Sequence, residues 1–255
     1  MWHATLGDPR GPTPKAGDVL PPLVHWCAFP PAVHMSELQA DGHPMVGGFL
    51  PPVPLRRRMW AGGTLKFGRA IRVGEPLERR SSIRSVTTKE GRSGPMVFVT
   101  VDHAIYGNHG LAVTEQQDIV YLEIPDSYTP PKKLPMPDTP LATRTVDPTE
   151  TLLFRYSALT FNAHRIHYDQ TYTREVEHYP GLVVHGPLQA SLLMQHAIAV
   201  KGRAPDQFHF RGVHPLFAGT PMDVVAFEDA AGLTLYTGAE GHQGMQAGAI
   251  WEGTQ

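Results

Sequence analysis

The sequence predicts an α+β protein in which antiparallel strands wrap around a central helix. The helix is expected over residues 186–201, where apolar side chains recur three and four positions apart. Pro187 suits its first position and Gly202 its C-terminal cap. Strand-like segments follow this helix, and a similar set occupies the first half of the chain. The pattern is typical of the hot-dog architecture, and two such units side by side predict a double hot-dog whose N-terminal helix could be degenerate.

Three segments describe the expected domain organisation. Residues 1–124 form an N-terminal hot-dog-like half with an irregular, Pro-rich start. Residues 125–140 contain six prolines and are expected to form a semi-stiff extended linker. Residues 141–255 are expected to form a C-terminal hot-dog, which contains the candidate catalytic residues described below. Fusing the sheets of the two units would remove exposed strand edges.

The first half is expected to begin with irregular backbone and continue as an antiparallel meander. Proline and glycine break residues 1–24, and residues 25–60 read as an ordered coil that packs tryptophan and phenylalanine side chains. Turns are expected at Lys89–Arg92 and Gly107–Gly110. The segments rich in β-branched and aromatic residues, and therefore expected as strands, are 64–71, 82–89, 95–106 and 111–122.

The second half is expected to start with a strand at residues 150–157 and to continue into a histidine-rich stretch. A short helix or turn at 171–178 precedes the central helix. The strands expected after that helix are 207–213, 221–228, 233–239 and 245–252.

Composition excludes several classes of protein. The formal net charge of −2 offers no basic face for nucleic acid or an anionic membrane. No apolar run approaches the ~18 residues of a membrane span, and the N-terminus lacks the layout of a secretory signal. The single cysteine, Cys27, excludes an internal disulfide framework and fits a reducing compartment, so a cytoplasmic location is expected. The 14 histidines show no metal-binding spacing, so no metal site is expected.

Two stretches carry the candidate chemistry. Residues 157–169 gather Asn162, His164, His167 and Asp169, and the second stretch begins the central helix at Gly186. A helix start directs unpaired N–H groups and the positive end of its dipole at whatever lies in front of it. An imidazole that faces this helix start could transfer a proton while the N–H groups hold a developing oxyanion.

These stretches resemble the MaoC-like hydratase and dehydratase superfamily. The resemblance is closest to the double hot-dog branch that includes mesaconyl-C4-CoA and itaconyl-CoA hydratases, and it covers most of the chain. Members of that branch usually carry a further N-terminal segment, so the start at Trp2-His-Ala-Thr-Leu6 is expected to be shortened or divergent. The stretches that carry the resemblance are 20–26, Asp41-Gly-His-Pro44, 47–55, 57–63, Phe161-Asn-Ala-His-Arg-Ile-His-Tyr-Asp169 and His185-Gly-Pro187.

The resemblance also implies roles for individual residues. The superfamily has an aspartate five residues before its catalytic histidine; on this spacing the histidine is His167 and the aspartate is replaced by Asn162. His167 is then the acid/base that activates water, Asn162 orients that water, and the Gly186 N–H polarises the thioester carbonyl. Asn162 could instead close an Asx turn, and His185 could simply pack near a turn. The candidate substrate-binding residues are Arg57, Arg58, Trp60, His164, Arg165, Tyr168 and His185.

The function expected from these residues is that of a cofactor-free hydro-lyase acting on a CoA thioester. It would hydrate a short α,β-unsaturated acyl-CoA reversibly, and the resemblance suggests a dicarboxylic substrate of the citramalyl-CoA to itaconyl- or mesaconyl-CoA type. The alternatives are a dehydratase acting on fatty acyl or carrier-protein 3-hydroxyacyl thioesters, and a non-catalytic thioester-binding hot-dog. No nucleic-acid or membrane partner is expected, and a homodimer of double units is the expected assembly if the chain associates.

Overall fold

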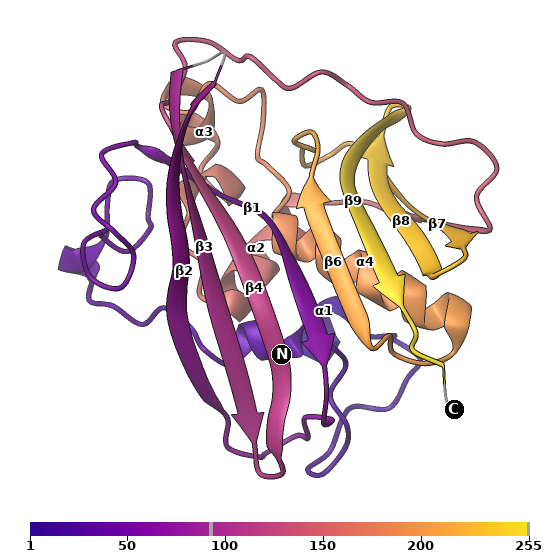
Figure 1. The fold of residues 1–255 in the computed structure, drawn as a ribbon. Coiled ribbons are helices and arrows are strands. Elements are labelled where there is room, and N and C mark those ends of the chain that lie inside the picture. Colours follow the sequence, from indigo (N-terminus) through magenta and orange to yellow (C-terminus); the bar gives the residue numbers. More distant parts are fainter. Residues whose placement is uncertain (92–93, 254–255) are drawn as a thin grey trace.

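The computed structural model describes residues 1–91 and 94–253, which build one nine-stranded antiparallel sheet. The strand order is β2-β3-β4-β1-β6-β9-β8-β7-β5, so β1 and β6 join the two halves of the chain (Figure 1). The strands are β1 Arg57–Phe67, β2 Glu78–Gly91, β3 Gly94–Gly107, β4 Gly110–Leu122, β5 Ala142–Val146, β6 Gln207–Gly212, β7 Met222–Asp229, β8 Gly232–Ala239 and β9 His242–Ile250.

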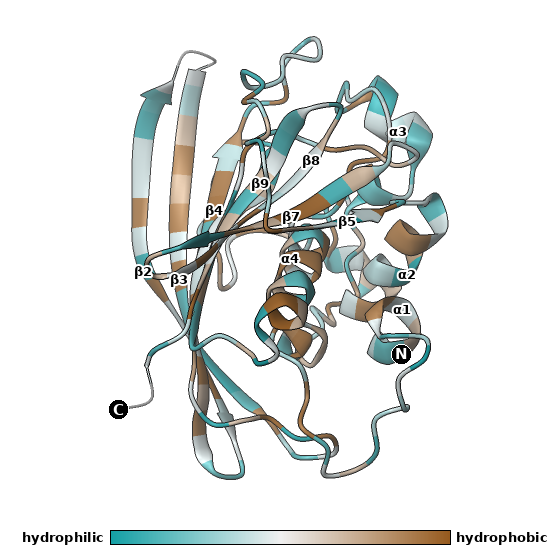
Figure 2. Cartoon of the chain, turned by 90° about the vertical axis from the view of Figure 1, so that its right-hand side faces the viewer, coloured by the Kyte–Doolittle hydropathy of each residue, from teal (hydrophilic) through white to brown (hydrophobic). Residues whose placement is uncertain are grey.

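The helices lie together on one side of this curved sheet (Figure 2). The longest, α4 (Gly186–Lys201), packs against β7, β8 and β9. Its Leu188, Leu193 and Ala197 side chains are fully buried, as expected of a helix that is apolar on nearly every side. The others are α1 Trp2–Leu6, α2 Glu150–Thr160 and α3 Gln170–Glu175, with 3₁₀ turns η1 Val24–Cys27, η2 Met35–Glu37 and η3 Arg165–His167.

The predicted α+β double hot-dog is confirmed. Among the described residues, only the second half has a helix at its centre. In the first half an irregular, Pro-rich segment takes the place of a second central helix. Val53 from this segment forms a core cluster with residues of β3 and β4, including Val99 and Tyr121. The seam between the halves is tight, because a Cβ at Gly62 would lie 2.5 Å from the carbonyl oxygen of Phe210.

One predicted element has the wrong type. Residues 150–157 were expected as a strand, but they begin helix α2. Thr149 caps this helix by accepting a hydrogen bond from the N–H of Leu152 at 3.1 Å. The buried side chains Leu153, Tyr156 and Ser157 are three and four positions apart, so a helical period was mistaken for a strand period.

One strand boundary and two short elements also differ from the prediction. The region expected to be coil up to residue 60 already contains the start of β1 at Arg57, because Gly62 and Gly63 serve close packing in a central strand rather than a turn. The irregular N-terminus contains the short helix α1, and β5 was missed within its Pro-rich surroundings.

The remaining strand predictions and the turn at 107–110 are confirmed within a few residues. The turn expected at 89–92 reaches residues 92–93, which lie outside the described part of the chain. Residues 125–140 form no helix or strand, and the domain boundary expected there stays a prediction.

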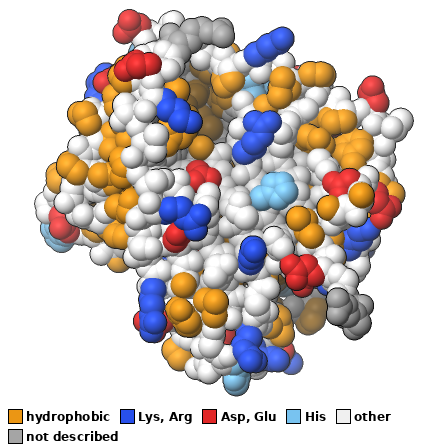
Figure 3. Space-filling model, viewed as in Figure 1, with side chains coloured by type: hydrophobic (Ala, Val, Ile, Leu, Met, Phe, Trp, Pro, Cys, Tyr) orange, Lys and Arg blue, Asp and Glu red, His pale blue; other side chains and the backbone are white. Residues whose placement is uncertain are grey.

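No helix among the described residues is long and apolar enough to cross a membrane. Charged side chains of both signs intersperse on the face of the sheet that is turned away from the helices (Figure 3).

Candidate active site

A cavity of about 2030 Å³ opens between the start of α4, the η3 segment and the irregular segment that precedes β1. Its walls combine residues from both halves of the chain, including His43, Arg58, Asn162, His167 and Gly186. The stretches that the sequence singled out on either side of residue 170 therefore meet at one site. A further wall comes from the 31–50 segment of the first half.

His167 is fixed in a single orientation at this cavity. It belongs to η3, is 7% exposed, and its Nδ1 lies 2.7 Å from the carbonyl oxygen of Val183. Because a carbonyl can only accept, Nδ1 carries the proton and Nε2 is a bare acceptor. The ring also stacks on His185, with 3.6 Å between centroids. Burial lowers the pKa of His167 well below its ordinary value, and the neighbouring His185 and His164 lower it further.

His185 supports His167 from behind and does not line the cavity. Its side chain is fully buried, and its Nε2 lies 2.8 Å from the Ser157 hydroxyl. Burial lowers the pKa of His185 to about 3, so the ring is neutral at physiological pH. The structure therefore gives no support to the predicted substrate contact of His185, and favours the packing alternative.

Asn162 lines the cavity and also closes a turn. Its Oδ1 accepts a hydrogen bond from the N–H of His164 at 2.9 Å, which is the Asx turn considered as an alternative. The preceding residue, Phe161, ends α2 in the left-handed conformation, with φ of 53°. The turn leaves the amide nitrogen of Asn162 as the group that can act as a donor toward the cavity.

Gly186 brings a helix N-terminus to the same cavity. It is the first residue of α4, so its N–H has no acceptor within the helix, and it lines the cavity with Pro187. The dipole of this 16-residue helix adds positive potential at that point. The arrangement can hold an oxyanion, as the sequence predicts.

The structure separates the candidate arginines. Arg57 lines the cavity but is committed to Glu177, with Nε 2.7 Å from Oε2 and a second hydrogen bond to the Glu177 carbonyl at 2.6 Å. Arg165 does not line the cavity; it pairs with Asp169 at 2.8 Å. Asp169 is thus occupied with Arg165 and with capping α3.

Arg58 differs from these two. It lines the cavity, and within the described residues no carboxylate oxygen lies within 4.0 Å of its guanidinium. Trp60 and Tyr168 also line the cavity, where the indole of Trp60 donates to the Gly62 carbonyl and the hydroxyl of Tyr168 donates to the Ala163 carbonyl. His164 lines it as well, 4% exposed, with a buried Nε2 that has no hydrogen-bond partner among the described residues.

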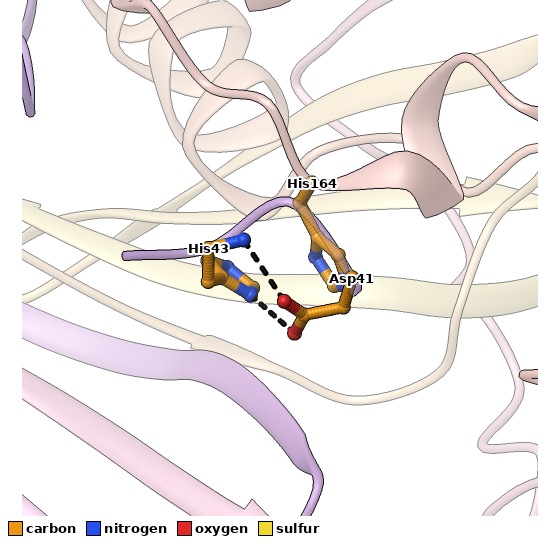
Figure 4. A group of neighbouring side chains, drawn as sticks. All are labelled: Asp41, His43 and His164. Atoms are coloured by element: carbon orange, nitrogen blue, oxygen red, sulfur yellow. Dashed lines mark hydrogen bonds and ion pairs between the residues drawn. The ribbon is translucent and has the colours of Figure 1, made fainter. Parts of the chain in front are cut away.

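Sequence reasoning missed three ionisable groups at this site, namely Asp41, His43 and Glu177. Asp41 and His43 lie in the segment Asp41-Gly-His-Pro44, which carried the family resemblance without being assigned a role. The Asp41 carboxylate accepts two hydrogen bonds from His43, at 2.9 Å from its N–H and at 2.8 Å from its Nδ1 (Figure 4). The ring of His43 lies 4.1 Å from that of His164, between centroids.

Electrostatics at this cluster follow from burial and these contacts. Burial alone would raise the pKa of Asp41, but the hydrogen bonds from His43 and the neighbouring His164 lower it to about 2. Burial lowers the pKa of His43 to about 3, and His164 and Arg58 act in the same direction. One ligand atom from each of Asp41, His43 and His164 lies within 4.8 Å of the others, close enough to share a cation. The prediction that the site holds no metal stays a prediction.

A match to a protein-family model shows which family the chain belongs to. The model of the hydroxyacyl-thioester dehydratase type 2 family matches residues 23–218. The chain belongs to this family. The MaoC-like affiliation and the hydro-lyase class expected from the sequence are thereby confirmed.

Two relatives illustrate the breadth of the family. Mesaconyl-C(4)-CoA hydratase from Chloroflexus aurantiacus is 50% identical over 226 residues, which cover 88% of this chain and 80% of the relative. The mitochondrial hydroxyacyl-thioester dehydratase type 2 from Schizosaccharomyces pombe is 28% identical over 235 residues, covering 82% of this chain and 78% of the relative.

Two solved structures share the fold. HtdX from Mycobacterium tuberculosis superposes with a TM-score of 0.68 and 17% identity over 98% of this chain and 94% of HtdX. A second protein from M. tuberculosis, described as having a double hot-dog fold, superposes with a TM-score of 0.55 and 14% identity over 96% of this chain and 83% of its own. Both likenesses concern the fold.

Proposed function

We propose that this family member catalyses the reversible hydration of a short dicarboxylic α,β-unsaturated acyl-CoA, of the type that interconverts mesaconyl-C4-CoA and citramalyl-CoA. The 50% identity to a mesaconyl-C(4)-CoA hydratase over most of the chain motivates the substrate class. In this reaction water adds to the β-carbon, and the α-carbon gains a proton.

The geometry provides the parts that hydration requires. The Gly186 N–H at the start of α4 donates a hydrogen bond to the thioester carbonyl oxygen and stabilises the enolate oxygen that forms there. The bare Nε2 of His167 accepts a hydrogen bond from the water and holds it, while the Asn162 amide orients the same water. Each such contribution is worth on the order of 10²–10⁴ in rate.

Arg58 is the feature of the cavity that favours a dicarboxylic substrate. It is the arginine of the predicted set that reaches the cavity without a carboxylate partner among the described residues, whereas Arg57 and Arg165 are paired. A guanidinium without a carboxylate partner can bind a substrate carboxylate with two parallel hydrogen bonds. We assign Arg58 to the free carboxylate of the substrate.

A dehydratase acting on long acyl chains is the second candidate. Exposed apolar side chains surround the cavity mouth, including Met35, Phe49 and Phe161, and they would suit an acyl chain as well as the pantetheine arm of CoA. That candidate requires no arginine close to the reacting carbons, so the behaviour of an Arg58 variant distinguishes the two.

The test is a spectrophotometric hydration assay with mesaconyl-C4-CoA, itaconyl-CoA and crotonyl-CoA, applied to the wild type and to Arg58→Met. Arg58→Met is expected to lower kcat/KM for the dicarboxylic substrate by roughly 10–100-fold, the equivalent of a charge-assisted hydrogen bond. Its kcat/KM for crotonyl-CoA, which has no second carboxylate, should change little. Equal losses on both substrates would contradict the assignment, and preference of the wild type for long 3-hydroxyacyl thioesters would favour the second candidate.

The homodimer also belongs to the proposal. Strand β2 is a 14-residue edge of the sheet with the exposed side chains Ile83 and Val86. An exposed edge of this length invites pairing with a second copy. Light scattering coupled to gel filtration measures the mass: twice 28.0 kDa supports the dimer, and 28.0 kDa contradicts it.

A further inference from the structure

Hydration needs a base that can keep the proton of water while the C–O bond forms. Asn162 cannot serve, because an amide has no basic site comparable to a carboxylate. His167 has the correct tautomer, but within the described residues no carboxylate oxygen lies within 4.0 Å of its ring nitrogens. Its imidazolium would therefore be a buried cation without a counter-ion, which is costly.

His43 has the counter-ion that His167 lacks. The Nδ1 of His43 donates to the Asp41 carboxylate at 2.8 Å, so the proton stays on Nδ1 and Nε2 is free to accept another. No described group lies within hydrogen-bond distance of Nε2, and His43 lines the cavity. A carboxylate behind an imidazole fixes the tautomer and stabilises the imidazolium that forms.

The fold holds this pair against the histidine-rich segment. The carbonyl of Asp41 accepts a hydrogen bond from the N–H of Arg165 at 2.9 Å, and the Arg165 side chain donates to the Ala40 carbonyl at 3.1 Å. Gly42 allows the approach, since a Cβ there would lie 1.8 Å from the Ala163 carbonyl oxygen. A segment of the first half is thus built into the site of the second half.

The position of Arg58 indicates which end of the substrate His43 faces. Arg58 and His43 both line the cavity, and the positive charge of Arg58 disfavours the charged form of His43. If Arg58 holds the free carboxylate, the β-carbon to which that carboxylate is attached lies on the His43 side. Gly186 and His167 then face the thioester end, because His167 stacks on the residue that precedes Gly186.

We propose that Asp41 and His43 form a catalytic dyad in which His43 carries the proton and Asp41 positions and stabilises its ring. The assignment rests on the proposed hydratase function. Water binds between the Nε2 atoms of His43 and His167. One O–H bond breaks as its proton moves to His43, and the oxygen forms the C–O bond at the β-carbon.

The electron pair of the double bond moves toward the thioester, whose oxygen becomes an enolate held by the Gly186 N–H. The imidazolium of His43 then gives its proton to the α-carbon, the enolate collapses to the thioester, and both histidines are neutral again. The proton and the hydroxyl group of one water molecule both end in the product. In this scheme His167 is not the base; its Nε2 holds the oxygen by accepting a hydrogen bond from the second O–H, which stays intact and becomes the hydroxyl of the product.

The test compares purified His43→Gln, His43→Ala, Asp41→Asn and the control His209→Gln, in which an exposed histidine of β6 is replaced. We expect His43→Gln to lower kcat for mesaconyl-C4-CoA by on the order of 10²–10⁴-fold. Asp41→Asn should lower kcat by about tenfold or more, because the wrong tautomer becomes accessible. Binding of a saturated acyl-CoA, measured by calorimetry, should change less than about threefold if only chemistry is lost, whereas His209→Gln should match the wild type.

Added imidazole should restore part of the rate of His43→Ala, since the cavity can admit the free base, and should not accelerate the wild type. A merely structural role for His43 predicts no such rescue. The proposal is overturned if His43→Gln stays active within about threefold, if imidazole does not rescue a folded His43→Ala, or if activity depends on a divalent metal that chelation removes. Wild-type protein without turnover on any enoyl-CoA would instead contradict the proposed function, so the two failures are distinguishable.

Discussion

Replacing Gly42 by alanine tests whether the first half of the chain builds the active site. Gly42 has φ of 92°, and an added Cβ would lie 1.8 Å from the carbonyl oxygen of Ala163. Real Cβ atoms essentially never come within 3.0 Å of such an atom, so the 41–43 segment must move away by more than 1 Å. That movement breaks the hydrogen bond from the Arg165 N–H to the Asp41 carbonyl and displaces His43 from the cavity wall.

The magnitude follows from two costs. The positive φ alone costs about 1 kcal/mol or more for alanine, and the lost hydrogen bond adds on the order of 1–3 kcal/mol. Gly17→Ala is the matched control, because Gly17 has φ of 88° and no atom within 4 Å of the added Cβ. A displacement of about 1 Å in a catalytic group lowers the rate by roughly 10²-fold.

Urea unfolding and the hydration assay measure both effects. Gly42→Ala should unfold at lower urea than Gly17→Ala and lose about 10²-fold in kcat, whereas Gly17→Ala should keep the wild-type kcat. If the two variants lose the same stability and both keep full activity, the reasoning that places the 41–43 segment in the site is refuted.

Two further predictions concern stability. The folded-state pKa of His185 is about 3 against about 6.5 in the unfolded chain, so the unfolded state binds more protons between these values. The free energy of unfolding should therefore fall by about 1.4 kcal/mol per pH unit below pH 6.5 from this residue, and urea curves of equal midpoint at pH 6.5 and 5.5 would contradict the burial of a neutral ring. Glu240 and Gly241 form the tight β8–β9 turn with φ of 51° and 76°, a conformation that suits Asn-Gly. Glu240→Asn should raise the free energy of unfolding by about 0.5–1 kcal/mol, and an unchanged or lower value would mean that the turn is not strained.

Local signals account for the elements that the sequence predicts well. Helix α4 has Pro187 at its start, Gly202 at its end and an unbroken apolar pattern between them. Helix α2 was predicted as a strand because its 11 residues contain short apolar runs that fit either period, and only the cap at Thr149 distinguishes them. Strand β1 was cut short because Gly62 and Gly63 are turn residues in most contexts.

The candidate site shows the same division between local and distant information. His167, Asn162 and Gly186 lie within 25 positions of one another in a motif that can be read directly, and the structure places all three at one cavity. The contact between Asp41 and Arg165 joins segments more than 100 positions apart, through a backbone hydrogen bond that no side-chain pattern reveals. The sequence also does not reveal the ion pairs of Arg57 and Arg165, because it does not show which arginine has a carboxylate beside it in space.

The uninterrupted sheet has a consequence for how this enzyme can diverge. Since β1 and β6 are hydrogen-bonded neighbours and the 41–43 segment contacts residues 163–165, the two halves must match each other at both contacts. If one half were exchanged with that of a homologue, the 41–43 segment, which contains the proton carrier His43, would contact residues 163–165 of a different sequence. Chimeras that exchange residues 1–124 alone should therefore still pair β1 with β6 but have a low kcat. Exchanging residues 163–165 together with them should restore kcat.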